Sequence, residues 1–375
     1  MDNPFKEILA KGLAMLKMGG SSSSESVVGI DIGASSIKVV QLKRKGGKAV
    51  LETYGALSLG PYGDLDVGNV TNLPEEKLGV ATVDVLKESD ITSKSCALSI
   101  PSSASLVFLI DIPAAVPEKE FANIIPTEAR KYIPVPISEV SLDWWAIPKK
   151  EESLEEATTE TVAQKTEILV AAIHNETISK YRDIVKRANL SADFFEIEVF
   201  SNIRSTFGHE LSPVLLLDLG ASKTKLSIVE HGIVRSFHII NRGGFDMTTA
   251  LSKSLSIPFT KAEQMKKELG LTTASADKSV AEILKLSVDY IISETNSVVL
   301  AYEKKYNRTI SKVILTGGGS LLKGFLEIAQ DNFHSEVILG NPFGKVEAPA
   351  FLEHALESAG PEFSVAVGLA LRKLS

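Results

Sequence analysis

Apolar residues along this chain fall into two similar sets of short runs, separated by glycine-containing turns, which is typical of β-strands. The first set predicts strands over residues 27–32, 37–42, 49–57 and 95–100, with a helix over 75–88. The second set predicts strands over residues 214–219, 225–230, 233–241 and 312–315, with helical sequence over 245–306, 321–333 and 364–374. We therefore predict an α/β fold in which one set of strands occurs twice.

The segment between the two sets, residues 102–189, has a different pattern. It predicts strands over residues 106–112, 140–147 and 167–173 and helices over residues 118–132 and 176–188. These elements indicate a compact α+β insert within the first half of the chain.

Residues 1–18 place apolar side chains at helical spacing, and residues 19–26 follow as a linker of glycine and polar residues, nearly all serine. The pattern predicts an amphipathic helix on a flexible tether. Two interpretations stay open: an arm that packs on its own domain or is disordered, and an anchor that binds a membrane surface or a partner. The apolar positions are Phe5, Ile8, Leu9, Leu13 and Leu16.

Composition limits the class of protein. A chain of 375 residues is long enough for two or more domains. Forty basic and 47 acidic residues give a net charge of −7, and no basic cluster occurs, so nucleic acid is not an expected partner. A single cysteine, Cys96, fits a reducing cytoplasm, and no apolar run reaches the ~18 residues of a membrane span. We expect a cytoplasmic protein without a transmembrane or secreted segment.

Two segments carry the same motif at the end of an apolar strand, Asp-x-Gly-Ala-Ser followed by lysine and a second strand. They are residues 29–38 and 217–225. A tight turn of this kind leaves backbone N–H groups and hydroxyls facing a phosphate, and an aspartate at the strand end suits Mg²⁺. One such hairpin is weak evidence because Asp-x-Gly turns are common, but two in one chain indicate a shared phosphate site.

A third element is an apolar strand that runs into a glycine run at residues 313–320. It predicts a close approach of backbone to a flat ligand and a following helix whose N-terminus faces a phosphate. The sequence contains no Walker loop, and leucine stands where G-x-G-x-x-G would need its last glycine. These observations exclude the P-loop and Rossmann interpretations.

The duplicated hairpins and the glycine run resemble the nucleotide-binding superfamily of actin, Hsp70 and the sugar kinases. Within it, four segments are similar to the family of type IV pilus assembly actin-like proteins, PilM: residues 30–33, 128–140, 341–343 and 363–371. The similarity extends over residues 27–374, and its Tyr-Ile-Pro-x-Pro-Ile stretch at 132–137 is more specific than the nucleotide loops.

The resemblance implies an α/β, actin-like (ribonuclease H-like) duplicated ATPase fold with a 1C insert of the type found in the cell-division protein FtsA. Domain I would comprise residues 27–101, 190–211 and 361–375, and the 1C insert would comprise residues 102–189. Domain II would comprise residues 212–360, with subdomain IIB at about 245–307. The helix at 1–18 and the linker at 19–26 lie outside this body.

The resemblance also implies ATP and Mg²⁺ as cofactors, with Asp31 and Asp218 holding the metal partly through water. The residues implied to bind the nucleotide are Asp31, Gly33, Ala34, Ser35, Ser36, Lys38, Asp218, Gly220, Ala221, Ser222, Lys223, Thr224, Gly243, Gly244, Glu263, Lys266, Gly317, Gly318, Gly319 and Ser320.

Three residue assignments each leave a second interpretation open. Lys38 either contacts the phosphates or is solvated, and Glu263 with Lys266 either binds ribose and adenine or forms a surface salt bridge. Glu198 is the candidate catalytic residue that would orient water, or else an acid without that role. Because no other candidate is present, we expect ATP binding with slow hydrolysis at most.

The function that the resemblance implies is an ATP-binding component of a type IV pilus, or related type II secretion-like, inner-membrane assembly platform. The expected partner is the cytoplasmic tail of a PilN-like membrane protein, with residues 1–18 on the membrane surface and self-association as further expectations. The protein would be cytoplasmic and peripheral on the inner membrane. The alternatives are an FtsA-like membrane-tethered filament former and a phosphotransferase of the sugar-kinase type, although neither a catalytic base nor a sugar pocket is apparent for the latter.

Overall fold

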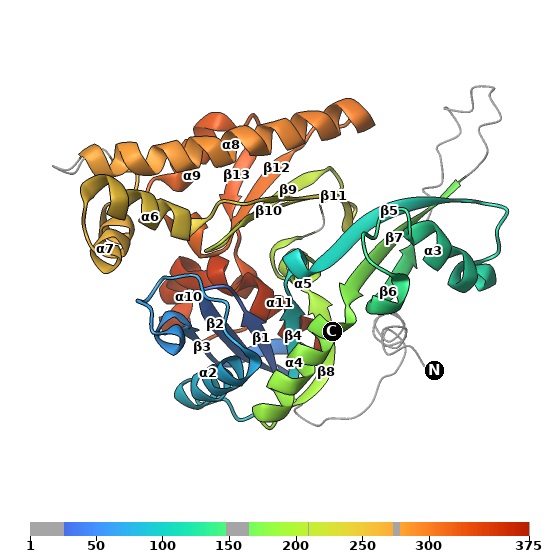
Figure 1. Cartoon of the computed structure of the whole chain (residues 1–375), viewed down its shortest axis with the longest axis horizontal. Helices are drawn as coiled ribbons and strands as arrows, with labels where there is room; N and C mark the ends of the chain where they lie inside the picture. The colour runs from blue at the N-terminus through green and yellow to red at the C-terminus, as the bar shows by residue number, and fades with distance from the viewer. Residues whose placement is uncertain (1–25, 148–164, 209, 273–277, 375) are drawn as a thin grey trace.

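The computed structural model describes residues 26–147, 165–208, 210–272 and 278–374. Two five-stranded sheets form the body of the molecule, and Figure 1 shows them in its lower and upper halves. The first sheet has the order β3-β2-β1-β4-β8, built from Lys48–Ser58, Ser36–Lys45, Ser26–Ile32, Ser95–Ile100 and Ser191–Ile197. The second sheet has the order β11-β10-β9-β12-β13, built from Ile233–Ile240, Thr224–Glu230, Val214–Leu219, Lys312–Thr316 and Glu336–Leu339.

The two sheets repeat one topology. In the first, β1 pairs antiparallel with β2 and parallel with β4, which pairs parallel with β8. In the second, β9 pairs antiparallel with β10 and parallel with β12, which pairs parallel with β13. This equivalence confirms the duplicated strand set that the hydrophobic pattern predicts.

Helices cover both faces of the first sheet. The helices α2 (Glu75–Glu88) and α4 (Asn175–Arg187) bury apolar faces against it, while α5 (Glu198–Thr206) and α11 (Ser364–Leu374) pack together. A Cβ added to Gly368 of α11 would stand 1.8 Å from the carbonyl oxygen of Ser201 in α5. Only glycine allows these two helices to approach so closely.

The second sheet has its own helical layer. Its helices are α6 (Gly244–Leu255), α7 (Phe259–Leu269), α8 (Lys278–Tyr306) and α9 (Phe325–Asn332). The long helix α8 runs along the top of the molecule in Figure 1 and contributes Val288 and Ile291 to a core that includes Leu215 and Leu217. A short helix, α10 (Glu353–Ala359), precedes α11.

The insert forms a separate unit at the side of the molecule (Figure 1). Its sheet has the order β5-β7-β6, built from Ser105–Pro113, Lys165–His174 and Val140–Ala146, with α3 (Phe121–Ala129) packed on it. Its core includes Ile112, Ile125 and Ile168, all of them buried. The sequence places helix α4 in this insert, but Ile178 and Ile184 of α4 belong to the core of the first sheet.

One predicted helix, after the glycine run, needs correction. The predicted helix from residue 321 to 333 is shorter, because residues Gly318–Leu321 form a 3₁₀ turn and α9 begins only at Phe325. Gly324 at the N-cap of α9 has a φ of 82°, which interrupts the helical backbone. In addition, strand β13 and helix α10 have no counterpart in the prediction.

The predicted amphipathic helix at 1–18 and nearly all of the linker at 19–26 lie outside the described residues. Among the helices that are described, none combines the length and the apolar character needed to cross a bilayer.

Candidate functional site

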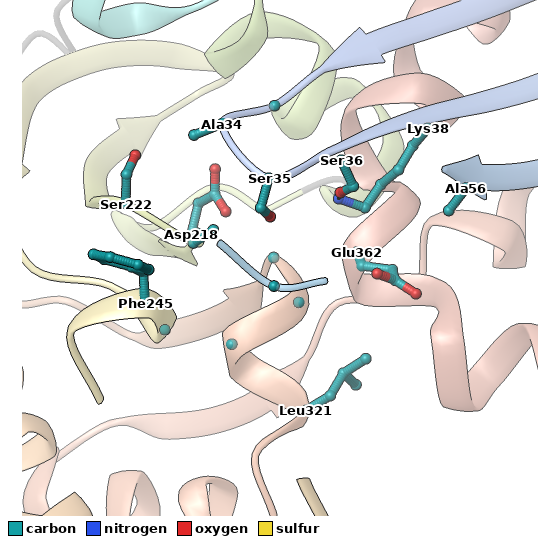
Figure 2. Close-up of a pocket in the computed structure, with 18 of the residues that line it drawn as sticks. Ala34, Ser35, Ser36, Lys38, Ala56, Asp218, Ser222, Phe245, Leu321 and Glu362 are labelled. Atoms are coloured by element: carbon teal, nitrogen blue, oxygen red, sulfur yellow. The ribbon is translucent and has the colours of Figure 1, made fainter. Parts of the chain in front are cut away.

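A cavity of about 550 Å³ lies between the two sheet domains (Figure 2). Its wall is formed by both Asp-x-Gly hairpins, by the glycine run after β12 and by the faces of α6 and α7. This volume is within the range of small-molecule sites. The duplicated fold thus brings both hairpins, the glycine run and the helices α6 and α7 around one cavity.

The first hairpin joins β1 to β2. The Gly33 backbone N–H donates to the Ser36 carbonyl at 3.0 Å and closes the turn. Ser35 and Ser36 line the cavity, and the Lys38 Nζ donates to the Ser36 Oγ at 3.0 Å. Figure 2 shows the Lys38 side chain folded toward Ser36 at the cavity wall. Asp31 also lines the cavity, and its Oδ1 accepts a hydrogen bond from the Ser99 hydroxyl at 2.7 Å.

The second hairpin, between β9 and β10, has the same turn. The Gly220 N–H donates to the Lys223 carbonyl at 3.0 Å, and Ser222 lines the cavity opposite the first hairpin. Lys225 lies directly across the ladder from Asp218, as Lys38 lies across from Asp31. Here, however, the lysine forms ion pairs.

Lys225 is held between two carboxylates. Its Nζ lies 2.8 Å from Glu198 Oε2 and 3.1 Å from Asp218 Oδ2. Burial by itself lowers the pKa of Lys225, but the charges of Asp218 and Glu198 outweigh it and raise the pKa above its usual value. Lys225 therefore carries a positive charge at every physiological pH.

Glu198, the candidate catalytic residue, is the first residue of α5 and lines the cavity. Its side chain is only 10% exposed. Its Oε1 accepts a hydrogen bond from the Ser102 backbone N–H at 2.7 Å, and its Oε2 pairs with Lys225. Both oxygens thus accept hydrogen bonds from the protein, which holds this carboxylate in a fixed position.

The glycine run lies directly under the second hairpin. Gly317 has a φ of 79°, and a Cβ added to it would stand 2.3 Å from the Asp218 Oδ1. Any larger residue would displace the aspartate, so the run needs glycine at this position. Gly317, Gly318 and Gly319 all line the cavity, as predicted.

Beside the second hairpin, where the Gly244 N–H donates to the Gly220 carbonyl, α7 is tied to α6 by a buried polar network. Lys266 Nζ lies 2.7 Å from Glu263 Oε2 and donates to the Gly244 carbonyl at 3.0 Å and to the Thr248 Oγ1 at 2.8 Å. The ammonium group holds the pKa of Glu263 below its usual value, although burial opposes this. Glu263 is 8% exposed, so the pair is no surface salt bridge.

Most of the predicted nucleotide-contacting residues share this one cavity. They are Asp31, Gly33, Ala34, Ser35, Ser36, Lys38, Asp218, Gly220, Ala221, Ser222, Lys223, Gly244, Glu263, Lys266, Gly317, Gly318 and Gly319. Their roles toward a nucleotide stay predictions.

Three predicted residues do not line the cavity. Thr224 is fully buried and its hydroxyl donates to the Arg242 carbonyl at 2.8 Å, because neighbours on a strand face opposite ways. Ser320 is 2% exposed and its hydroxyl donates back to the Gly317 carbonyl. Gly243 is the N-cap of α6, one residue before the lining position.

Sequence reasoning missed several lining residues. The clearest is Lys225, which the repeated Asp-to-Lys spacing of the two hairpins could have indicated. Others come from segments whose position depends on tertiary structure, among them Val67, Gly68, Phe245, Met247, Leu321, Leu322 and Glu362.

The predicted Mg²⁺ site can be tested against this geometry. Asp218 is already paired with the Lys225 ammonium group, and Asp31 accepts a hydrogen bond from Ser99. Across the part of the chain that the structure describes, no group of three or more Asp, Glu, His or Cys side chains is arranged to hold a metal ion. The Lys225 ammonium group at Asp218 Oδ2 thus competes with a metal bound directly to that oxygen, and the magnesium assignment stays a prediction.

Comparison with known proteins shows the family of this chain. The model of the family described as type IV pilus assembly protein PilM matches residues 29–374. This chain belongs to that family. A solved PilM–PilN type IV pilus biogenesis complex matches the structure with a TM-score of 0.78 at 23% identity, covering 94% of this chain and 100% of that one. The PilM family assignment and the actin-like fold are therefore confirmed.

Two further relatives support the fold. The ethanolamine utilization protein EutJ from Carboxydothermus hydrogenoformans matches with a TM-score of 0.54 at 15% identity, covering 99% of both chains. The cell division protein FtsA of Neisseria meningitidis serogroup B is 23% identical over 215 residues, which is 51% of this chain and 50% of FtsA. The chain thus spans about half the length of the curated FtsA relatives that it matches.

Proposed function

We propose that this member of the PilM family binds ATP in the cavity between its two domains and acts in the inner-membrane assembly platform of a type IV pilus. The observation that carries the proposal is the pairing of two equivalent hairpins around one cavity. Each hairpin contributes serine hydroxyls and a tight turn from opposite sides, which is the arrangement that a chain of phosphates requires.

The cavity lining offers groups for both the phosphates and the nucleoside of ATP. The phosphates would lie between Ser35 of the first hairpin and Ser222 of the second, which Figure 2 shows on either side of Asp218. The nucleoside would extend toward α6 and α7, where Phe245 offers an apolar face and the Glu263 network lies in the wall. The hydroxyls and the apolar face in this lining support the ATP assignment.

The proposed partner is the cytoplasmic tail of a PilN-like membrane protein. The insert offers a place for an extended segment, because β5 and β6 are the two edge strands of its sheet. Beside them, Tyr132 is 52% exposed and stacks on Phe108 with the ring centroids 4.9 Å apart. An exposed tyrosine stacked on a half-buried phenylalanine next to a sheet edge fits a peptide-binding surface, where tyrosine is enriched.

The insert also contacts the second domain, which gives a route for nucleotide-dependent conformation. Arg235 of β11 pairs with Glu167 of β7, and Ile233 packs with Ile147 and Leu169 of the insert. Closure of the two domains around ATP would move β11 and thereby the insert. In this proposal the protein is cytoplasmic and peripheral on the inner membrane, with residues 1–18 as an added contact to the membrane or to another copy.

The direct experiment measures ATP binding by isothermal titration calorimetry to the full chain and to Ser35→Glu. A carboxylate at this position would repel the phosphates, so we expect the affinity to fall by at least about tenfold. The matched control is Ser254→Glu, which places the same charge on the exposed face of α6 and should leave the affinity unchanged. Equal binding by both variants would refute the site.

The partner proposal has a separate readout. Capture of a PilN-like tail peptide should weaken in Tyr132→Ala, while Tyr290→Ala on the exposed face of α8 should bind as the wild type does. If both variants capture the peptide equally, the tail does not dock at the aromatic pair of the insert.

A further inference from the structure

The two hairpins present the same lysine in two different settings. Lys38 and Lys225 each lie opposite the aspartate of their own hairpin. Lys38 contacts only a hydroxyl among the contacts described for it, at 3.0 Å from Ser36 Oγ, whereas Lys225 contacts two carboxylates. The second hairpin therefore holds its lysine in a fixed, ion-paired position beside the cavity.

The Lys225 ammonium group lies where it would oppose a metal ion bound to Asp218. The side chains of Lys225, Glu198 and Asp218 are only 20%, 10% and 13% exposed, so their charges are weakly screened by solvent. A divalent ion bound to Asp218 would have to displace the ammonium group or stand beside it. Displacement would break the ion pair, and a position beside the ammonium group would bring two positive charges together. Both are costly in a partly buried site.

A triphosphate nonetheless needs a positive charge in this cavity, since three carboxylates line the same wall: Asp31, Asp218 and Glu198. The single positive charge of the Lys225 ammonium group is shared between two of them, offsets one of their charges and still borders the open volume. Its three N–H donors exceed its two ion-pair partners, which leaves one donor for a phosphate oxygen.

We propose that Lys225 takes the place of a metal ion in this cavity, so that ATP binds to this protein without Mg²⁺. The inference rests on the proposed function, because it concerns the same nucleotide. Lys225 pairs with Asp218 and Glu198 and donates directly to the phosphates, and the aspartate of the second hairpin positions the lysine instead of coordinating a metal.

The test measures the affinity of the full chain for the non-hydrolysable analogue AMPPNP by calorimetry, in excess EDTA and in excess magnesium. For the wild type, the dissociation constant should differ by less than about threefold between the two conditions. The double variant Lys225→Met/Glu198→Gln removes both charges of the closest ion pair and limits the loss of stability. It should bind at least about tenfold more weakly in EDTA and regain affinity in magnesium, because Asp218 is then free to hold the metal.

A second measurement uses no nucleotide. Titration with Mn²⁺ alone, followed by the electron paramagnetic resonance of the free ion, should detect no binding to the wild type and binding to the double variant. Lys253→Met, on the exposed face of α6, is the matched control and should behave as the wild type does in both assays.

The outcomes separate the two proposals. If the wild type binds AMPPNP only with magnesium, or if the double variant binds as tightly as the wild type in EDTA, Lys225 does not replace the metal, while the nucleotide site itself stands. If the wild type binds no nucleotide in either condition, the proposed function fails, and the role of Lys225 fails with it.

Discussion

The hairpin of β1–β2 and the hairpin of β9–β10 share a motif, a turn hydrogen bond and a ladder register, yet their lysines differ. Lys225 is fixed by Glu198, which follows directly after strand β8 at the start of α5. The equivalent strand of the second sheet, β13, is followed by Gly340, which has no side chain to offer Lys38. A duplicated fold can thus give identical motifs different electrostatic roles through one residue on a neighbouring element.

The largest expected effect concerns stability. Lys225→Met leaves Glu198 and Asp218 without their counter-ion in a partly buried site, so it should lower the free energy of unfolding by about 3 kcal/mol. Lys38→Met removes only a hydrogen bond to Ser36 and should cost less than about 0.5 kcal/mol. Urea unfolding of the two variants measures both values, and equal losses would show that the two lysines are equivalent after all.

An intermediate effect concerns affinity. Lys38 is bound only to a hydroxyl in the described structure, so it is free to turn toward a phosphate at the cost of one weak contact. Lys38→Met should therefore weaken ATP binding about tenfold, or by about 1.4 kcal/mol, without a change in unfolding. Calorimetry with Lys253→Met as the control checks this, and unchanged binding would mean that Lys38 is only solvated.

The smallest expected effect concerns turnover. Because both Glu198 oxygens accept bonds from Ser102 and Lys225, hydrolysis should be far slower than the ~10 s⁻¹ typical of enzymes. Glu198→Gln should lower the residual rate and change the affinity for ATP by less than about threefold. A phosphate-release assay decides this, and turnover in the ordinary enzymatic range would show that Glu198 is released from Lys225 when ATP binds.

The two hairpins and their sheets also differ in how far they could be predicted from the sequence. Most strands of the two sheets are apolar runs ended by glycine turns, so periodicity predicts them and their duplication. Thr224 was assigned to the phosphates although strand alternation places it on the face opposite Lys225. The Lys225–Glu198 pair was out of reach, because it depends on how the end of β8 meets β10 across the domain boundary.

Short elements and boundaries were harder still. Strand β13 has four residues and too little sequence to show a period, so it was not predicted. Helix α4 follows strand β7 of the insert in sequence, and only its apolar contacts with the first sheet reveal where it packs. The limits of the insert at 102–189 thus depend on tertiary contacts that a pattern of single residues does not contain.

The most direct test of the account is a crystal structure of the full chain with AMPPNP, grown in the presence of magnesium. We expect the phosphates between Ser35 and Ser222, with the Lys225 Nζ within about 3.2 Å of a phosphate oxygen and no metal between Asp218 and the nucleotide. A nucleotide bound outside this cavity, or a magnesium ion coordinated by Asp218 with Lys225 displaced, would contradict the account.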